Sequence, residues 1–127
     1  MVRRLIACLF LFCPALDAAE LQKTVPEHFR GTWASSVKDC DAIGAESKLT
    51  IGETGIDFYE SRGRILAIAT EGTNELGLLM ELTGEGKTWL DARKFTLSQD
   101  GQTLTYDTGG EHTVVRMRCE AHKRVGS

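Results

Sequence analysis

The sequence is short of the features that mark many catalytic and membrane proteins. It has three histidines in 127 residues, and none stands in a nucleophile motif such as Gly-x-Ser-x-Gly. The glycine-rich stretch Gly84–Gly86 lacks the Lys-Ser/Thr ending of a phosphate-binding loop. The longest apolar run, Leu5–Leu16, is too short for a spanning helix, which needs about 20 residues. Pairs among Glu60, Glu71, Glu81 and Glu85 are the remaining catalytic alternative, but acids are common here, and we expect a protein that is not an enzyme.

The first nineteen residues have the layout of a secretory signal peptide. The basic pair Arg3-Arg4 precedes the run Leu5–Leu16, and the small pair Ala18-Ala19 offers a cleavage site before a polar segment. A lipoprotein signal ending at Cys8 is the alternative, but it leaves too little room for an apolar region. We predict a signal peptide over 1–19, a single domain over 20–127, and a periplasmic or secreted location without membrane insertion after cleavage.

An excess of basic residues is also missing. Without residues 1–19, 13 Lys and Arg stand against 17 Asp and Glu, a net charge of −4, which argues against nucleic acid or an anionic membrane as partner. Two cysteines remain, Cys40 and Cys119, and an even pair in an exported chain predicts a disulfide. A metal site built on Cys119 and His122 would need further ligands that the sequence does not place nearby, so we expect no metal and no cofactor.

Alternation of apolar and polar residues dominates the chain from Gly31 onward. Short alternating segments, separated by Gly-, Asn- and Asp-containing turns at a spacing of about 8–12 residues, predict eight antiparallel strands. The clearest stripe is Leu76, Leu78, Met80 and Leu82, which share one parity. The short turns favour a single all-β domain in which the strands form an up-and-down barrel, preceded by a short helical turn over Pro26–Phe29.

Two strands leave their inward face to be decided. In the stretch Thr88–Ser98, Leu90 and Ala92 share one parity while Phe95 and Leu97 share the other, so we expect a bulge near Arg93-Lys94. On the last strand Val115, Met117 and Cys119 alternate with Arg116 and Arg118. The parity of Cys119 favours Val115 and Met117 as the core side, with the arginines outside.

Two resemblances follow from these residues. Gly31-Thr32-Trp33 on the first strand, with an arginine on the last, resembles the lipocalin-like (calycin) barrels, in which the Trp closes one end and a late Arg packs over it. This resemblance implies barrel-end packing between Trp33 and Arg116, with Arg118 as the alternative. The motifs Phe29–Trp33, Phe58–Ser61, Gly84–Trp89 and Arg118-Cys119 make the chain similar to small exported proteobacterial proteins, a resemblance that supports fold and location and adds no chemistry.

The candidate contact residues lie in two turns. Tyr59, Arg62 and Arg64 surround one turn and Trp89 follows another, and Tyr, Trp and Arg are enriched at binding hot spots. The alternative for the first turn is a solvated hairpin with cationic ends. We expect a monomeric binding protein that recognises a protein partner, for example as an inhibitor of a secreted or envelope enzyme. The second hypothesis is carriage of a small apolar ligand in a lumen lined by Phe58, Leu76, Leu78 and Met80.

Overall fold

The computed structural model describes residues 19–107 and 112–119. The predicted signal peptide, apart from Ala19, and His122 lie outside the described residues. The strands are β1 (Glu20–Gln22), β2 (Gly31–Ala34), β3 (Leu49–Ile51), β4 (Gly55–Asp57), β5 (Arg62–Glu71), β6 (Glu75–Gly84), β7 (Lys87–Leu97), β8 (Thr103–Asp107) and β9 (Thr113–Arg118). A 3-10 turn, η1 (Glu27–Phe29), and a short helix, α1 (Val37–Asp41), complete the described part. No helix in these ranges is long and apolar enough to cross a membrane.

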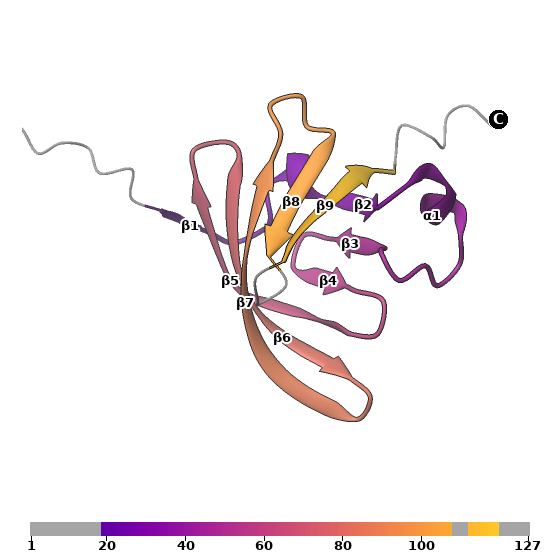
Figure 1. Cartoon of the computed structure of the whole chain (residues 1–127). Helices are drawn as coiled ribbons and strands as arrows, with labels where there is room; N and C mark the ends of the chain where they lie inside the picture. Colours follow the sequence, from indigo (N-terminus) through magenta and orange to yellow (C-terminus); the bar gives the residue numbers. More distant parts are fainter. Residues whose placement is uncertain (1–18, 108–111, 120–127) are drawn as a thin grey trace, which may run out of the picture.

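Strands β2 to β9 form a closed antiparallel barrel (Figure 1). Each strand pairs with its neighbour in sequence, and β2 pairs with β9 to close the circle. The structure therefore confirms the predicted eight-stranded up-and-down barrel and the helical turn before its first strand. The extra strand β1 was not predicted. Among the described strands its partner is β5, with a register from Glu20 opposite Thr70 to Gln22 opposite Ile68.

The interior of the barrel is filled by apolar side chains. The predicted stripe Leu76, Leu78, Met80 and Leu82 is buried along its whole length and belongs to one cluster that also holds Trp33 and Phe95. A cavity wide enough for a water molecule would leave surface exposed on the side chains that line it, and Leu76 and Met80 are 0% exposed. The burial of these side chains is typical of a small barrel whose interior is filled by side chains.

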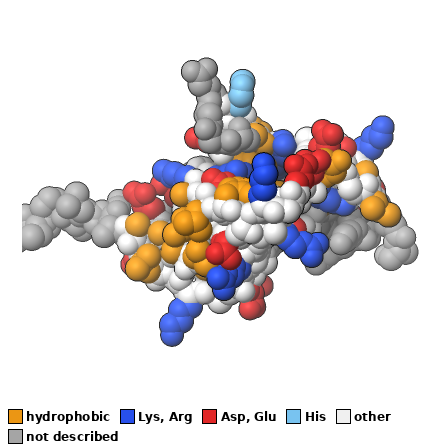
Figure 2. Space-filling view, turned by 90° about the horizontal axis from the view of Figure 1, so that it is seen from below, with side chains coloured by type: hydrophobic (Ala, Val, Ile, Leu, Met, Phe, Trp, Pro, Cys, Tyr) orange, Lys and Arg blue, Asp and Glu red, His pale blue; other side chains and the backbone are white. Residues whose placement is uncertain are grey.

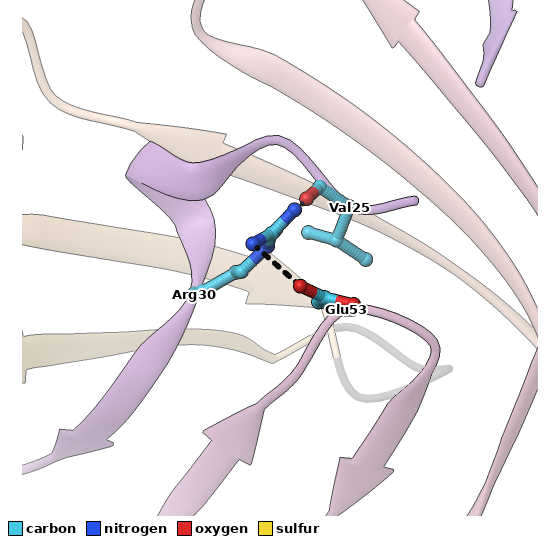
Figure 3. A network of polar contacts seen from close by, with 3 residues as sticks. All are labelled: Val25, Arg30 and Glu53. Atoms are coloured by element: carbon cyan, nitrogen blue, oxygen red, sulfur yellow. Dashed lines mark hydrogen bonds and ion pairs between the residues drawn. The ribbon is translucent and has the colours of Figure 1, made fainter. Parts of the chain in front are cut away.

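The segment before β2 closes one end of the barrel. Val25 and Phe29 are buried there, and the indole N–H of Trp33 donates to the carbonyl of Phe29 at 3.1 Å. Arg30 fixes this segment from the side, because its Nε donates to the carbonyl of Val25 at 2.7 Å and its Nη1 lies 3.3 Å from Glu53 Oε1 (Figure 3). The backbone N–H of Val25 in turn donates to the carbonyl of Glu53 at 2.9 Å. These contacts tie the η1 segment to the β3–β4 turn.

The disulfide lies beside the strand pair that closes the barrel. Cys40 and Cys119 are bonded, with their Cα atoms 5.5 Å apart, as the sequence predicts. The N–H of Cys119 donates to the carbonyl of Thr32 at 2.9 Å, so the bridge begins where β9 leaves β2. Cys40 sits on α1, whose start is capped by Ser36, the side chain of which accepts from the N–H of Asp39. The bond therefore joins the first and last strands of the barrel through this helix.

The face of β9 that meets the core is the opposite of the predicted one. Val114 packs against the core while Val115 is 55% exposed, so Arg116 and Arg118 share the inward parity. The arginine over Trp33 is Arg118, whose guanidinium carbon lies 4.2 Å from the ring centroid. Arg116 instead donates to the carbonyl of Ser47 at 2.8 Å. A late arginine does pack over the tryptophan, as the resemblance implies. That arginine is Arg118, so the prediction of Arg116 is wrong.

Arg118 is held by more than the ring of Trp33. Its Nε donates to the carbonyl of Gly101 at 2.9 Å, its Nη1 to that of Arg30 at 3.0 Å, and its Nη2 to that of His28. A planar guanidinium can stack and donate in several directions at once, whereas an ammonium cannot. Arg118 therefore connects β9, the β7–β8 turn and η1 at this end of the barrel.

Loss of the disulfide should lower the free energy of unfolding by about 4–5 kcal/mol, because the bridge closes a loop with a sequence separation of 79 residues. The test is urea unfolding of the Cys40→Ala/Cys119→Ala variant, followed by tryptophan fluorescence. Wild-type protein reduced with dithiothreitol is the control and should lose a similar amount. A loss below about 1 kcal/mol in both would contradict a role in closing the barrel.

Arg118→Lys should cost about 1–3 kcal/mol of unfolding free energy, because one ammonium cannot replace the stacking and the three carbonyl bonds. Arg116→Lys is the matched control on the same strand and should cost less than about 1 kcal/mol. Urea unfolding measures both. Equal losses would show that the two arginines do equivalent work.

Candidate functional site

The predicted contact residues gather at one end of the barrel, on two neighbouring hairpins. Tyr59 lies in the turn between β4 and β5 and is 48% exposed, and Trp89 on β7 is 40% exposed. The strand register places Arg62 opposite Thr83 and Leu82 opposite Trp89, so the β4–β5 and β6–β7 hairpins end side by side. We call this end of the molecule the tip.

The two hairpins touch through their backbones at the tip. A Cβ built on Gly84 would lie 2.3 Å from the carbonyl oxygen of Glu60, so only glycine allows this approach. A Cβ on Gly63 would lie 1.8 Å from the carbonyl oxygen of Glu81. The β6–β7 connection is the two-residue turn Glu85-Gly86, with both residues at positive φ (50° and 75°), as in a type I′ hairpin. Gly63 and Gly84 therefore determine how closely the hairpins pack at the tip.

The tip presents its candidate residues on different faces. Tyr59 and Arg62 line a shallow hollow of about 370 Å³, together with Phe58, Glu60 and Thr83. Arg64 lies on the outer face and its Nε is 3.2 Å from Glu81 Oε1. Trp89 is opposite the buried Leu82 and so shares the inner face. The structure thus brings Tyr59 and Arg62 together and separates Arg64 and Trp89 onto opposite faces of the sheet.

The register of β7 contains no bulge. Its pairing with β6 runs without a shift from Lys87 opposite Gly84 to Thr96 opposite Glu75, so the bulge expected near Arg93-Lys94 is wrong. Trp89, Asp91, Arg93 and Phe95 consequently share the inner face, and Leu90 and Ala92 lie outside. The unshifted register lets β7 pair with β6 from Lys87 to Thr96, well beyond the three residues that pair with β8.

An ion pair that the sequence reading missed lies on the inner face of β7. Arg93 Nη2 is 2.6 Å from Asp91 Oδ2, and the two side chains are only 15% and 23% exposed. The guanidinium of Arg93 lies over the rings of Phe58 and Tyr106, at 4.8 and 5.6 Å from their centroids. Its Nε is buried without a hydrogen-bond partner among the described residues. An unbroken alternation from Phe95 back to Trp89 was the signal that could have placed both charges inside.

Apolar side chains are exposed on the outer face of the long strands. Figure 2, viewed from the side of the tip, shows apolar side chains gathered beside acidic and basic ones. Leu79 and Leu90 are both more than one third exposed. A hollow of about 450 Å³ nearby, which we call the outer groove, is lined mainly by small or apolar residues: Ala67, Ala69, Gly77, Leu78, Leu79, Ala92, Arg93 and Lys94. Small residues leave this part of the outer face open.

The lowered pKa values in the described ranges belong to turns away from the tip. The hydroxyls of Ser47 and Ser35 donate to Asp39 and lower the pKa of its carboxyl group. The pKa of Asp100 is lowered mainly by the hydroxyl of Ser98 and by the backbone N–H of Gln102. Asp39 ties α1 to the segments on either side of it, and Asp100 orders the β7–β8 turn. Within residues 19–107 and 112–119, no group of three or more His, Cys, Asp or Glu side chains could hold a metal ion.

Comparison of the chain with protein-family models, with curated proteins and with solved structures finds no match. The fold and the tip define a small closed barrel with one disulfide and with exposed Tyr, Trp, Arg and Leu side chains on its long hairpins.

Gly84→Ala should destabilise the protein by about 1–3 kcal/mol, because its Cβ would meet the backbone of Glu60. Gly77→Ala is the matched control on the same strand, since its Cβ would meet Ala69 only at an ordinary 3.9 Å. That control should be neutral or stabilising by about 0.5–1 kcal/mol. Thermal unfolding measures both variants, and a neutral Gly84→Ala would show that the two hairpins separate freely.

Proposed function

We propose that this protein is an exported, non-enzymatic binding protein that recognises a protein partner through its tip. The observation that carries the proposal is the close backbone packing of the two hairpins at Gly84 and Glu60, which holds exposed Tyr59 and Arg62 on a rigid support. A binding site on a backbone that is fixed before association loses less conformational entropy than one on a mobile loop, and Tyr and Arg are enriched at binding hot spots. An inhibitor of a secreted or envelope enzyme is one role that suits such a scaffold.

Export is supported by the disulfide. Bridges of this kind persist in oxidising compartments, so Cys40–Cys119 is consistent with a periplasmic or secreted protein. The net charge of −4 without residues 1–19 favours a protein partner over nucleic acid. A monomer is the simplest state for a closed barrel that recognises a different protein.

Carriage of an apolar ligand within the barrel is the weaker alternative. The side chains expected to line such a lumen include Leu76, Leu78 and Met80, which are 0%, 3% and 0% exposed. A carrier needs interior surface that is accessible to its ligand, commonly several hundred cubic ångströms of space. Dense packing beside these three residues favours recognition on the outside of the barrel.

Tyr59→Ala/Arg62→Ala should weaken capture of the partner at least about tenfold, as expected when hot-spot side chains are truncated. The measurement is a pull-down from envelope extract by tagged protein, followed by titration of the captured protein. Glu71→Ala/Gln99→Ala, at the opposite end of the long strands, is the control and should bind like wild type. Equal binding by the tip variant and the control would rule the tip out as the contact surface.

A further inference from the structure

Strand β7 has one covered edge and one edge that is mostly open. Its pairing with β6 extends from Lys87 to Thr96, whereas β8 pairs only with Phe95, Thr96 and Leu97. Between Lys87 and Lys94 no described residue pairs with the second edge. Figure 1 shows this half of the β6–β7 hairpin reaching beyond the end of β8. We call it the open edge.

The turn geometry determines which backbone groups point outward from the open edge. In a two-residue hairpin the flanking pair, here Gly84 and Lys87, exchanges hydrogen bonds, so odd-numbered residues of β7 bond to β6. The bond from the N–H of Leu97 to the carbonyl of Asn74, at 2.8 Å, agrees with this pattern. The N–H and C=O groups of Thr88, Leu90 and Ala92 therefore face away from β6.

The chain covers a comparable edge elsewhere. Strand β4 pairs with β5 over Arg62, Gly63 and Arg64, so the stretch Ile68–Thr70 of β5 lies beyond it. Strand β1 pairs with this stretch and covers its edge. The open edge of β7 receives no such strand from the described residues, and it contains neither proline nor a bulge. Proteins usually blunt an open edge by such means, because it is ready to pair with another chain.

Pairing between two copies of this edge meets like charges. In an antiparallel dimer centred on Asp91, the two Asp91 side chains stand opposite each other, and a dimer centred on Leu90 sets Lys87 opposite Arg93. These are the two registers that would use most of the edge while keeping inner and outer faces aligned. The charges on the inner face therefore favour a partner strand of different sequence over a second copy.

We propose that the open edge of β7 accepts an extended segment of the protein partner as an added strand. The segment would place apolar residues on the side of Leu90 and Ala92 and an acidic residue on the inner side beside Lys87, because Arg93 is already paired with Asp91. Backbone bonds to Thr88, Leu90 and Ala92 would hold it, and the alternating side chains would select it. This inference rests on the proposed function and names the form in which the partner binds.

Amide hydrogen exchange on the disulfide-bonded protein, followed by nuclear magnetic resonance, tests the assignment. In the free protein the amides of Leu90 and Ala92 should exchange fast, and those of Trp89 and Asp91 slowly. The probe is an acetylated and amidated heptapeptide in which valine alternates with polar residues, one of them glutamate and the others threonine. At millimolar concentration it should slow exchange at Leu90 and Ala92 at least about tenfold and leave Trp89 and Asp91 unchanged. Slow exchange at Leu90 and Ala92 in the free protein, or no added protection with the peptide, overturns the proposal.

Ala92→Pro removes an outward N–H and no bond of the β6–β7 ladder, so it should abolish the effect of the peptide, while Ala92→Val should retain it. If the proline variant does not fold, a peptide N-methylated along its pairing edge replaces it and should give no protection to wild-type protein. Protection by that peptide would also overturn the proposal. Tyr59→Ala/Arg62→Ala should keep the peptide effect, which separates failure of the edge from failure of the tip.

Discussion

Closure of β2 against β9 is the constraint on which the other features depend. Trp33 pairs with Arg118 in the strand register, the guanidinium of Arg118 covers the indole, and the disulfide adjoins this pair. The two strands come from opposite ends of the domain, so their pairing has a high entropic cost in an unlinked chain. The bridge and the stacked arginine offset this cost at the same place. With the circle closed, the hairpins in between are free to differ in length.

That difference in length produces the tip. Strands β3 and β4 have three residues each, whereas β5, β6 and β7 have ten, ten and eleven. Strands that long cannot find partners along their whole length in a barrel whose other strands are short. One surplus edge is covered by β1 and the other, on β7, is open in the described part of the chain. The candidate site is thus a geometric consequence of uneven strand lengths around a closed barrel.

Features of the fold that depend on alternation and on turn residues can be predicted from the sequence. The inward face of a strand is predicted wrongly where apolar residues face outward. The stripe from Leu76 to Leu82, the glycine turns, the strand order and the disulfide were all accessible from residue patterns. The false bulge and the reversed face of β9 have one cause: each prediction places an apolar residue, Leu90 or Val115, in the core, and both are more than half exposed. Folded proteins expose many apolar side chains, so an apolar residue does not by itself identify the inner face. Strand β1 was missed because three exposed residues carry no pattern, and only the uncovered edge of β5 gives them a place.

Near each end of the barrel an arginine lies over aromatic rings. Arg118 covers Trp33 beside the β7–β8 turn, and Arg93 covers Phe58 and Tyr106 toward the other end of β8. A guanidinium is weakly hydrated and can rest on an apolar floor while donating to groups at the rim. Arginines in these positions let apolar packing continue to both mouths of the barrel, so the interior serves stability. The hairpins at the tip, by contrast, carry exposed aromatic and basic side chains and, within the described residues, backbone groups of β7 without a strand partner.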